Sequence, residues 1–164
     1  MSWQILSLGL HLWALALWLG GVIFFLVVFG PALKEIEPGV AMRILNHGRR
    51  SFEAVAWTGI SLLFITGIVN LILRRQAGAS SLGQFYLVAL SIKLMIFGAM
   101  VYHHGLQVFK YGTRIAAMTA ETSPEAVSWP ETLRILWQRW FTLLKINATL
   151  GPIATLMGLV LLKS

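Results

Sequence analysis

The sequence predicts an all-α integral membrane protein, an up-down bundle of four transmembrane helices, and two observations lead to this fold class. The 164-residue chain is 57% hydrophobic and only 12% charged, unlike a soluble domain. It also contains four apolar runs, each long enough to cross a hydrocarbon core of about 30 Å. We therefore expect residues 1–164 to form one transmembrane domain. The chain has no cysteine, so disulfides and thiolate metal sites are excluded.

The expected spans are separated by residues that end or restart helices. The spans cover residues 5–29, 54–73, 85–108 and 141–162. Pro31 and the Glu37-Pro38-Gly39 cluster end the first span, and the helical spacing of 40–53 predicts that the second span begins outside the membrane. Residues 76–84 are expected to form a short loop, and the chain becomes polar from 111 to 128.

The fourth span is expected to begin well before the membrane. Ser128-Trp129-Pro130-Glu131 matches a capping box with proline at the first helical position. A helix from there to Leu162 would be ~50 Å long, so its first turns should lie outside the hydrocarbon or at its surface. Trp129, Trp137 and Trp140 suit the depth of the membrane interface.

Lysine and arginine gather on one side of the predicted bundle, the side of the loops that follow spans one and three. This side carries Lys34, Arg43, Arg49, Arg50, Lys110, Arg114, Arg134, Arg139 and Lys145, whereas the other carries Arg74, Arg75 and Lys163. Because basic residues mark the cytoplasmic side, we expect both termini on the non-cytoplasmic side. The net charge of +7 is thus assigned to orientation and to contact with membrane lipid, and not to nucleic-acid binding.

Ionisable side chains inside apolar spans cost free energy, so they are candidates for function. Counting 1.5 Å per residue places His11, Lys93, Met157 and Asn70 at one depth near the chain termini. We call this set the terminal layer. His11 is expected to be a ligand or a proton relay, the alternative being a simple hydrogen bond to Asn70 or to a neighbouring backbone. Lys93 is expected to be an interior counter-ion, the alternative being that it snorkels.

A second set of polar residues is expected at the opposite depth, and we call it the loop layer. His103 and His104 end the third span at the level of Asn147 on the fourth. Lys93, Met100 and His104 lie within ~20° of one direction on a helix, so His104 rather than His103 is expected to face the interior.

Further polar residues lie at the level of the loop layer or just outside it. His47, Arg50 and Glu53 come before the second span, and His47 is either a ligand or a solvated residue. Arg43, Arg49 and Arg50 predict a positive patch that faces lipid headgroups.

Spans one and three carry a family resemblance. The first, LHLWALALWLGGVIFFLVVFGPAL, resembles the opening helix of the copper resistance protein D family of bacterial membrane proteins, with His11, then Trp-Leu-Gly-Gly, then Pro-Ala-Leu. The third, SIKLMIFGAMVYHHGLQ, is similar to the lysine-leucine helix of that family. The layout also resembles the four-helix bacterial membrane protoporphyrinogen oxidases, which have an early histidine, a lysine in the third helix and associated haem b. The resemblance extends to His11 and Lys93, whereas His103-His104 replaces a single histidine and leaves the axial ligand open.

The resemblance and the polar residues together predict a haem-b-binding redox protein of the bacterial inner membrane, with a membrane oxidoreductase activity as one form of it. It would exchange electrons with a quinol, a porphyrinogen or a partner subunit. The expected metal ligands are His11 with Met157 in the terminal layer, and His104 or His103 with His47 in the loop layer. Lys93 or Arg50 would pair with haem propionates, and Trp18, Trp13 and Phe97 offer flat surface for the macrocycle.

Two other functions remain open from the residues alone. A copper-binding or copper-transport protein would pass Cu(I) between His11, Met100, His104 and Met157, since thioether and imidazole groups suit that ion. A non-catalytic accessory subunit would instead pack its glycine-rich helices on a respiratory complex, or on another copy of itself. Ligands paired at one depth favour haem, and a ladder of ligands through the membrane favours copper transport.

Overall fold

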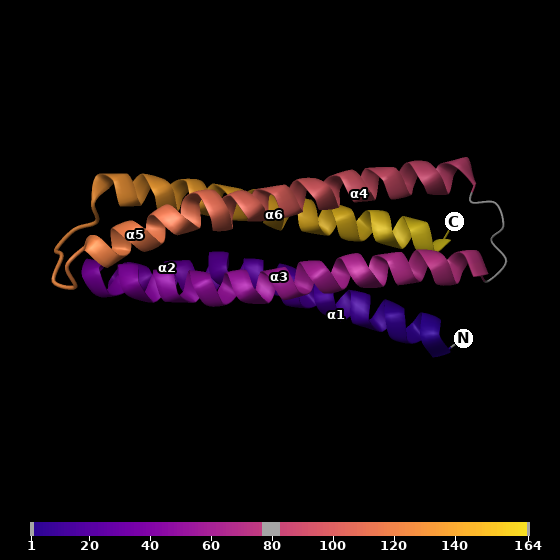
Figure 1. The fold of residues 1–164 in the computed structure, drawn as a ribbon, viewed down its shortest axis with the longest axis horizontal. Coiled ribbons are helices and arrows are strands. Elements are labelled where there is room, and N and C mark those ends of the chain that lie inside the picture. The colour runs from indigo at the N-terminus through magenta and orange to yellow at the C-terminus, as the bar shows by residue number, and fades with distance from the viewer. Residues whose placement is uncertain (1, 77–82, 164) are drawn as a thin grey trace.

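The computed structural model describes residues 2–76 and 83–163, and this part of the chain forms helices and loops without a strand. Figure 1 shows four long helical rods side by side, each running opposite to the one before it. Both termini lie at one end, which we call the terminal end, and we call the other the loop end (Figure 1). Each rod contains a stretch long and apolar enough to cross a membrane; three of these stretches contain the expected spans, and the fourth, Glu131–Leu161, covers the expected span 141–162 except its last residue.

Two of the rods contain turns of π-helix or 3-10 helix. The first rod consists of α1 (Ser2–Phe24), the π-helical η1 (Phe25–Phe29), α2 (Gly30–Ala32) and the 3-10 turn η2 (Leu33–Glu35), and the second is α3 (Pro38–Gln76). The third consists of α4 (Gln84–Gly105), the π-helical η3 (Leu106–Gly112) and α5 (Thr113–Glu121), and the fourth is α6 (Glu131–Lys163). The expected loop 76–84 lies mostly outside the described residues.

The third rod continues further than the sequence predicted. The helix passes the expected end at 108 and reaches Glu121, although the chain becomes polar there. α5 is amphipathic and buries Ile115 and Thr119 against the other rods. Packing of one apolar face is therefore sufficient to keep this polar stretch helical.

The start of the fourth rod also differs from the prediction. α6 begins at Glu131, and the Glu131 carboxylate accepts hydrogen bonds from Arg134 at 3.0 and 2.8 Å instead of turning back to Ser128. Trp137 and Trp140 are 3% and 0% exposed, so they pack inside the bundle and do not face the membrane interface.

The apolar core consists of a large cluster and a small one. In the large cluster, Phe25, Phe52 and Trp140 bring three rods together, with ring centroids 5.2 to 6.1 Å apart. The small cluster, which contains Tyr86 and Leu161, lies at the terminal end. The terminal layer falls between these two clusters along the rods.

α1 packs mainly on α3, and a glycine permits the close approach of the two helices. A Cβ atom on Gly59 would lie 3.0 Å from Trp18 Cβ and 3.3 Å from the Ala14 carbonyl oxygen. Because the Ala14 carbonyl oxygen belongs to the backbone of α1, this helix would have to move to make room for the Cβ atom.

Gly59→Ala is therefore expected to destabilise the protein by roughly 1–3 kcal/mol through overpacking. Gly98→Ala is the matched control, because a Cβ there meets nothing within 4 Å. Alanine favours the helix over glycine by up to about 1 kcal/mol, so the control should leave the melting temperature unchanged or raise it. Thermal unfolding of the detergent-purified variants measures both effects. A Gly59→Ala protein as stable as Gly98→Ala would contradict the close packing.

Candidate functional site

His11 on α1 is held by a residue of α3 that the sequence analysis did not single out. His11 Nδ1 lies 2.7 Å from Thr66 Oγ1, and Thr66 Oγ1 donates to the Leu62 carbonyl oxygen at 2.5 Å. Because a hydroxyl has one hydrogen, the tautomer that satisfies both contacts is the one in which His11 Nδ1–H donates to Thr66. The neutral ring then has its lone pair on Nε2. Thr66 thus fixes the orientation of the His11 ring.

Lys93 on α4 is the charged member of the terminal layer. It is half-buried, and a Cβ atom on Gly158 of α6 would lie 3.2 Å from its Nζ. Its charge is near enough to act on His11. Among residues 2–76 and 83–163, no acidic side chain forms an ion pair with Lys93. The sequence has no aspartate, and its glutamates all lie in 35–53 and 121–131, towards the loop end.

Asn70 and Met157 are the other expected members of the terminal layer, and both are half-buried. Asn70 follows Thr66 by four residues, so the two share a face of α3, but it is Thr66 that bonds His11. Met157 precedes Gly158, the glycine that faces Lys93. The terminal layer therefore draws on all four rods. The signal for Thr66 in the sequence was its position one turn from Asn70.

His104 of the loop layer is completely enclosed. It is 0% exposed, and its ring packs edge-on against Trp57 and Phe52, with centroids 5.2 and 6.0 Å away. In the described part of the chain neither ring nitrogen has a well-aligned hydrogen bond, although Gln107 and the Glu53 backbone face the ring. Helical spacing correctly placed Met100 and His104 on the buried face, since Met100 is 3% exposed.

The other expected members of the loop layer lie close to His104 in the chain or in space. Asn147 on α6 is buried, and its Nδ2 donates to the Met100 carbonyl oxygen at 3.3 Å. His103 is half-buried. Trp57 both covers His104 and lines a surface groove of about 640 Å³ that contains Tyr102 and Phe109.

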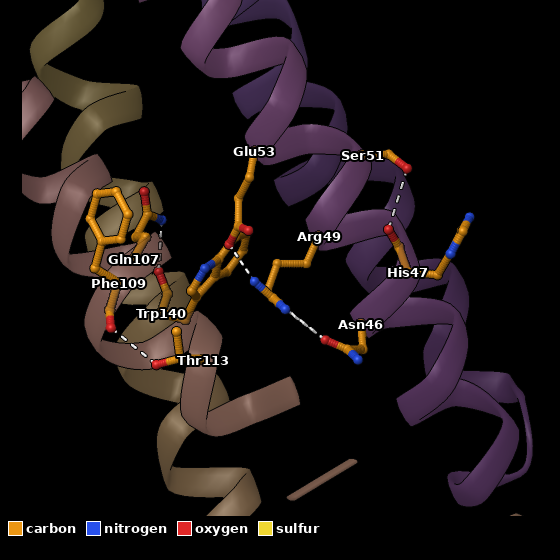
Figure 2. Close-up of polar contacts among 9 residues, drawn as sticks. All are labelled: Asn46, His47, Arg49, Ser51, Glu53, Gln107, Phe109, Thr113 and Trp140. Carbon is orange, nitrogen blue, oxygen red and sulfur yellow. Dashed lines mark hydrogen bonds and ion pairs between the residues drawn. The ribbon is translucent and has the colours of Figure 1, made fainter. Parts of the chain in front are cut away.

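Arg49 forms a buried ion pair, so the expectation that it faces lipid headgroups is wrong. Its Nη1 donates to Glu53 Oε1 at 2.5 Å, and its Nε and Nη2 donate to Asn46 Oδ1 at 3.2 and 2.8 Å. Arg49 is 3% exposed, and the Trp140 indole lies beside the carboxylate (Figure 2). A Cβ on Gly112 of η3 would lie 2.5 Å from Arg49 Nη1, so only glycine fits there. The Arg–Glu spacing of four residues was the signal in the sequence.

His47 and Arg50 lie on the surface of α3. Figure 2 shows His47 with Ser51 on the side of α3 turned away from Arg49 and Glu53. The exposed position gives no support to a pairing of His47 with His104. In the two described segments, no three or more His, Cys, Asp or Glu residues are grouped so as to hold a metal. Arg50 lies about 24 Å from Thr66 along α3. It is therefore far from the terminal layer, to which Lys93 belongs.

Trp18, expected as a flat surface for a cofactor, is part of the apolar core. It is 2% exposed, and its ring meets Phe97 edge-on with centroids 6.3 Å apart. Trp13, by contrast, is 76% exposed.

The fold and its polar residues define a helical bundle with two separate interior polar layers. Comparison with protein-family models, with curated proteins and with solved structures finds no match to this chain. The resemblance to the copper resistance protein D family and to the protoporphyrinogen oxidases therefore stays a prediction.

Glu53→Ala is expected to destabilise the protein by roughly 3–5 kcal/mol, because it leaves the Arg49 charge buried and unpaired. Arg49→Met combined with Glu53→Leu should recover most of that loss, since no charge is then buried. Unfolding of the detergent-purified proteins measures both. Arg134→Met is the control, because the Arg134–Glu131 pair is exposed and should contribute little. A double variant as unstable as Glu53→Ala would argue against the ion pair as the cause.

Proposed function

We propose that this chain is an integral protein of a bacterial inner membrane that binds haem b in the terminal layer and transfers electrons. Insertion is supported by the outward faces of the rods, where Trp13, Phe64 and Met95 are 76%, 58% and 75% exposed. Apolar surface of this extent suits hydrocarbon better than water. Basic residues concentrate at the loop end, so we propose that this end is cytoplasmic and that both termini are not.

The haem proposal rests on two groups at one depth: His11, whose Nδ1 is engaged with Thr66 so that Nε2 is left for a ligand, and Lys93, which has no acidic partner in the described chain and whose charge reaches His11. Haem b fits both groups, because its iron takes a neutral imidazole nitrogen and its propionates are carboxylates that can neutralise an ammonium. A bare copper ion would satisfy His11 but would add positive charge next to Lys93.

Each residue of the terminal layer then has a distinct role. His11 would hold the iron through Nε2, and Thr66 would keep the ring in the required tautomer and orientation. Lys93 would pair with a propionate and, as a positive charge, would favour the reduced state. Met157 would be a second residue able to hold the iron, because a thioether is a suitable haem ligand. The bound haem would supply a one-electron redox couple, with a quinol, a porphyrinogen or a partner subunit as electron donor or acceptor.

His104 is the alternative haem ligand, and copper handling is the alternative function. Trp57 and Phe52 enclose the His104 ring, so a macrocycle there would require both aromatic residues to move. His11 is only partly buried, and among the described residues no aromatic ring packs against it. This difference is why we place the haem in the terminal layer.

The detergent-purified protein is expected to give a b-type reduced-minus-oxidised visible spectrum, with iron on metal analysis. His11→Ala should abolish the spectrum, whereas His47→Ala, the exposed control, should leave it intact. Lys93→Gln should retain the haem and lower its reduction potential. Loss of the spectrum in His104→Ala alone would move the site to the loop layer. Stoichiometric copper without haem would replace the proposal by copper handling, and absence of both would favour an accessory subunit.

Thr66→Val is expected to weaken haem binding by roughly 10–100-fold, because His11 loses the group that orients it. Thr58→Val is a matched control, since Thr58 also donates to the carbonyl four residues earlier but is exposed and lies on the same helix. Haem titration of the apoproteins measures the two affinities. Equal affinities in the two variants would remove Thr66 from the site.

A further inference from the structure

A second candidate site lies at the loop end, away from the proposed haem site. A pocket of about 360 Å³ separates α3 from α5. It is lined by Arg43, Asn46, Arg50, Ala116, Thr119 and Ala120. The three α3 residues recur at helical spacing, as do the three α5 residues, so each helix presents one face. The two alanines leave the room that makes the pocket.

Each polar side chain that lines this pocket can donate a hydrogen bond to a ligand. Asn46 Oδ1 already accepts two hydrogen bonds from Arg49, which leaves the Asn46 amide Nδ2–H₂ to donate elsewhere. Thr119 is only 5% exposed, and its Oγ1 has no hydrogen-bond partner within the described residues. A buried hydroxyl without a partner costs free energy, so a bound acceptor would relieve that cost.

The charged side chains that line the pocket are both positive. Arg43 and Arg50 are exposed, and neither takes part in the ion pairs found across residues 2–76 and 83–163. The carboxylate of Glu53 is bonded to Arg49 and also attracts Arg50 electrostatically, but it does not line the pocket. The exposed Glu121 follows Ala120 on α5 but does not line the pocket.

We propose that this pocket binds a phosphate group. Two guanidinium forks, one amide and one hydroxyl match the several acceptor oxygens of a phosphate ester, because guanidinium bonds such oxygens in pairs. The shared chemistry fits either the headgroup of an anionic phospholipid or free inorganic phosphate. The pocket lies at the end of the bundle where the apolar stretches give way to basic residues, the depth at which a headgroup would be found.

The test is a titration of the full-length protein in non-ionic detergent with two probes, inorganic phosphate and short-chain phosphatidylglycerol. Thermal unfolding reports binding, because a ligand of the folded state raises the melting temperature in a concentration-dependent way. Each probe is compared with sodium chloride at equal ionic strength. A shift with phosphatidylglycerol alone identifies a lipid headgroup, a shift with phosphate alone identifies free phosphate, and a shift with both identifies the phosphate group whatever its source.

Three variants separate the pocket from general surface charge. Arg43→Gln and Arg50→Gln should each weaken binding by roughly tenfold, and Thr119→Val by roughly fivefold to tenfold. Arg134→Gln, an exposed arginine on α6 outside the pocket, should leave binding unchanged. No shift with either probe would overturn the proposal. Equal weakening by Arg134→Gln would do the same, because it would show general electrostatic attraction. The haem spectrum is a separate readout, so this proposal and the proposed function can fail independently.

Discussion

The ion pair between Arg49 and Glu53 is the interaction on which the packing of the bundle depends most. It joins two turns of α3, receives Gly112 of the third rod at a distance that only glycine permits, and lies beside Trp140 of the fourth rod. Three rods therefore meet at one pair of charges. Burial of these charges is tolerable because the pair is close and because Asn46 Oδ1 accepts two further guanidinium hydrogen bonds. The π-helical turn η3 ends at Gly112, where the third rod meets this pair.

Lys93 presents the opposite situation at the other end of the bundle. Its side chain is half-buried. All the glutamates of the chain, however, lie in segments towards the loop end, far along the sequence from Lys93. The two charges therefore differ in their surroundings. The Arg49 charge is neutralised by Glu53, whereas Lys93 forms no ion pair among the described residues. Arg43 and Arg50 likewise form no ion pair within residues 2–76 and 83–163, whereas Arg49 forms one with Glu53.

Much of the fold was predictable from local pattern, because an apolar run of sufficient length allows few structures in a membrane. The four spans, the continuous helix of α3 and the inward direction of Met100 and His104 follow from length and helical spacing. The polar appearance of 111–121 was misleading, because an amphipathic helix needs only one apolar face to pack. Trp137 and Trp140 were misplaced for a related reason. Aromatic residues at that depth suit either the interface or the core, and only the neighbouring rods decide between the two.

The sequence by itself determined the helical class, the positions of the spans and the segregation of charge between the two ends, since these depend on composition and on spacing along one helix. Depth counting also placed His11 and Lys93 at one level. Only the tertiary structure decided which side chains meet: that Thr66 rather than Asn70 holds His11, that Arg49 is buried on Glu53, and that His47 faces away from that ion pair. The physical reason is that depth follows from the rise per residue of a single helix, whereas a hydrogen bond between helices depends on their rotation and separation. Those are set by the packing of all four rods together.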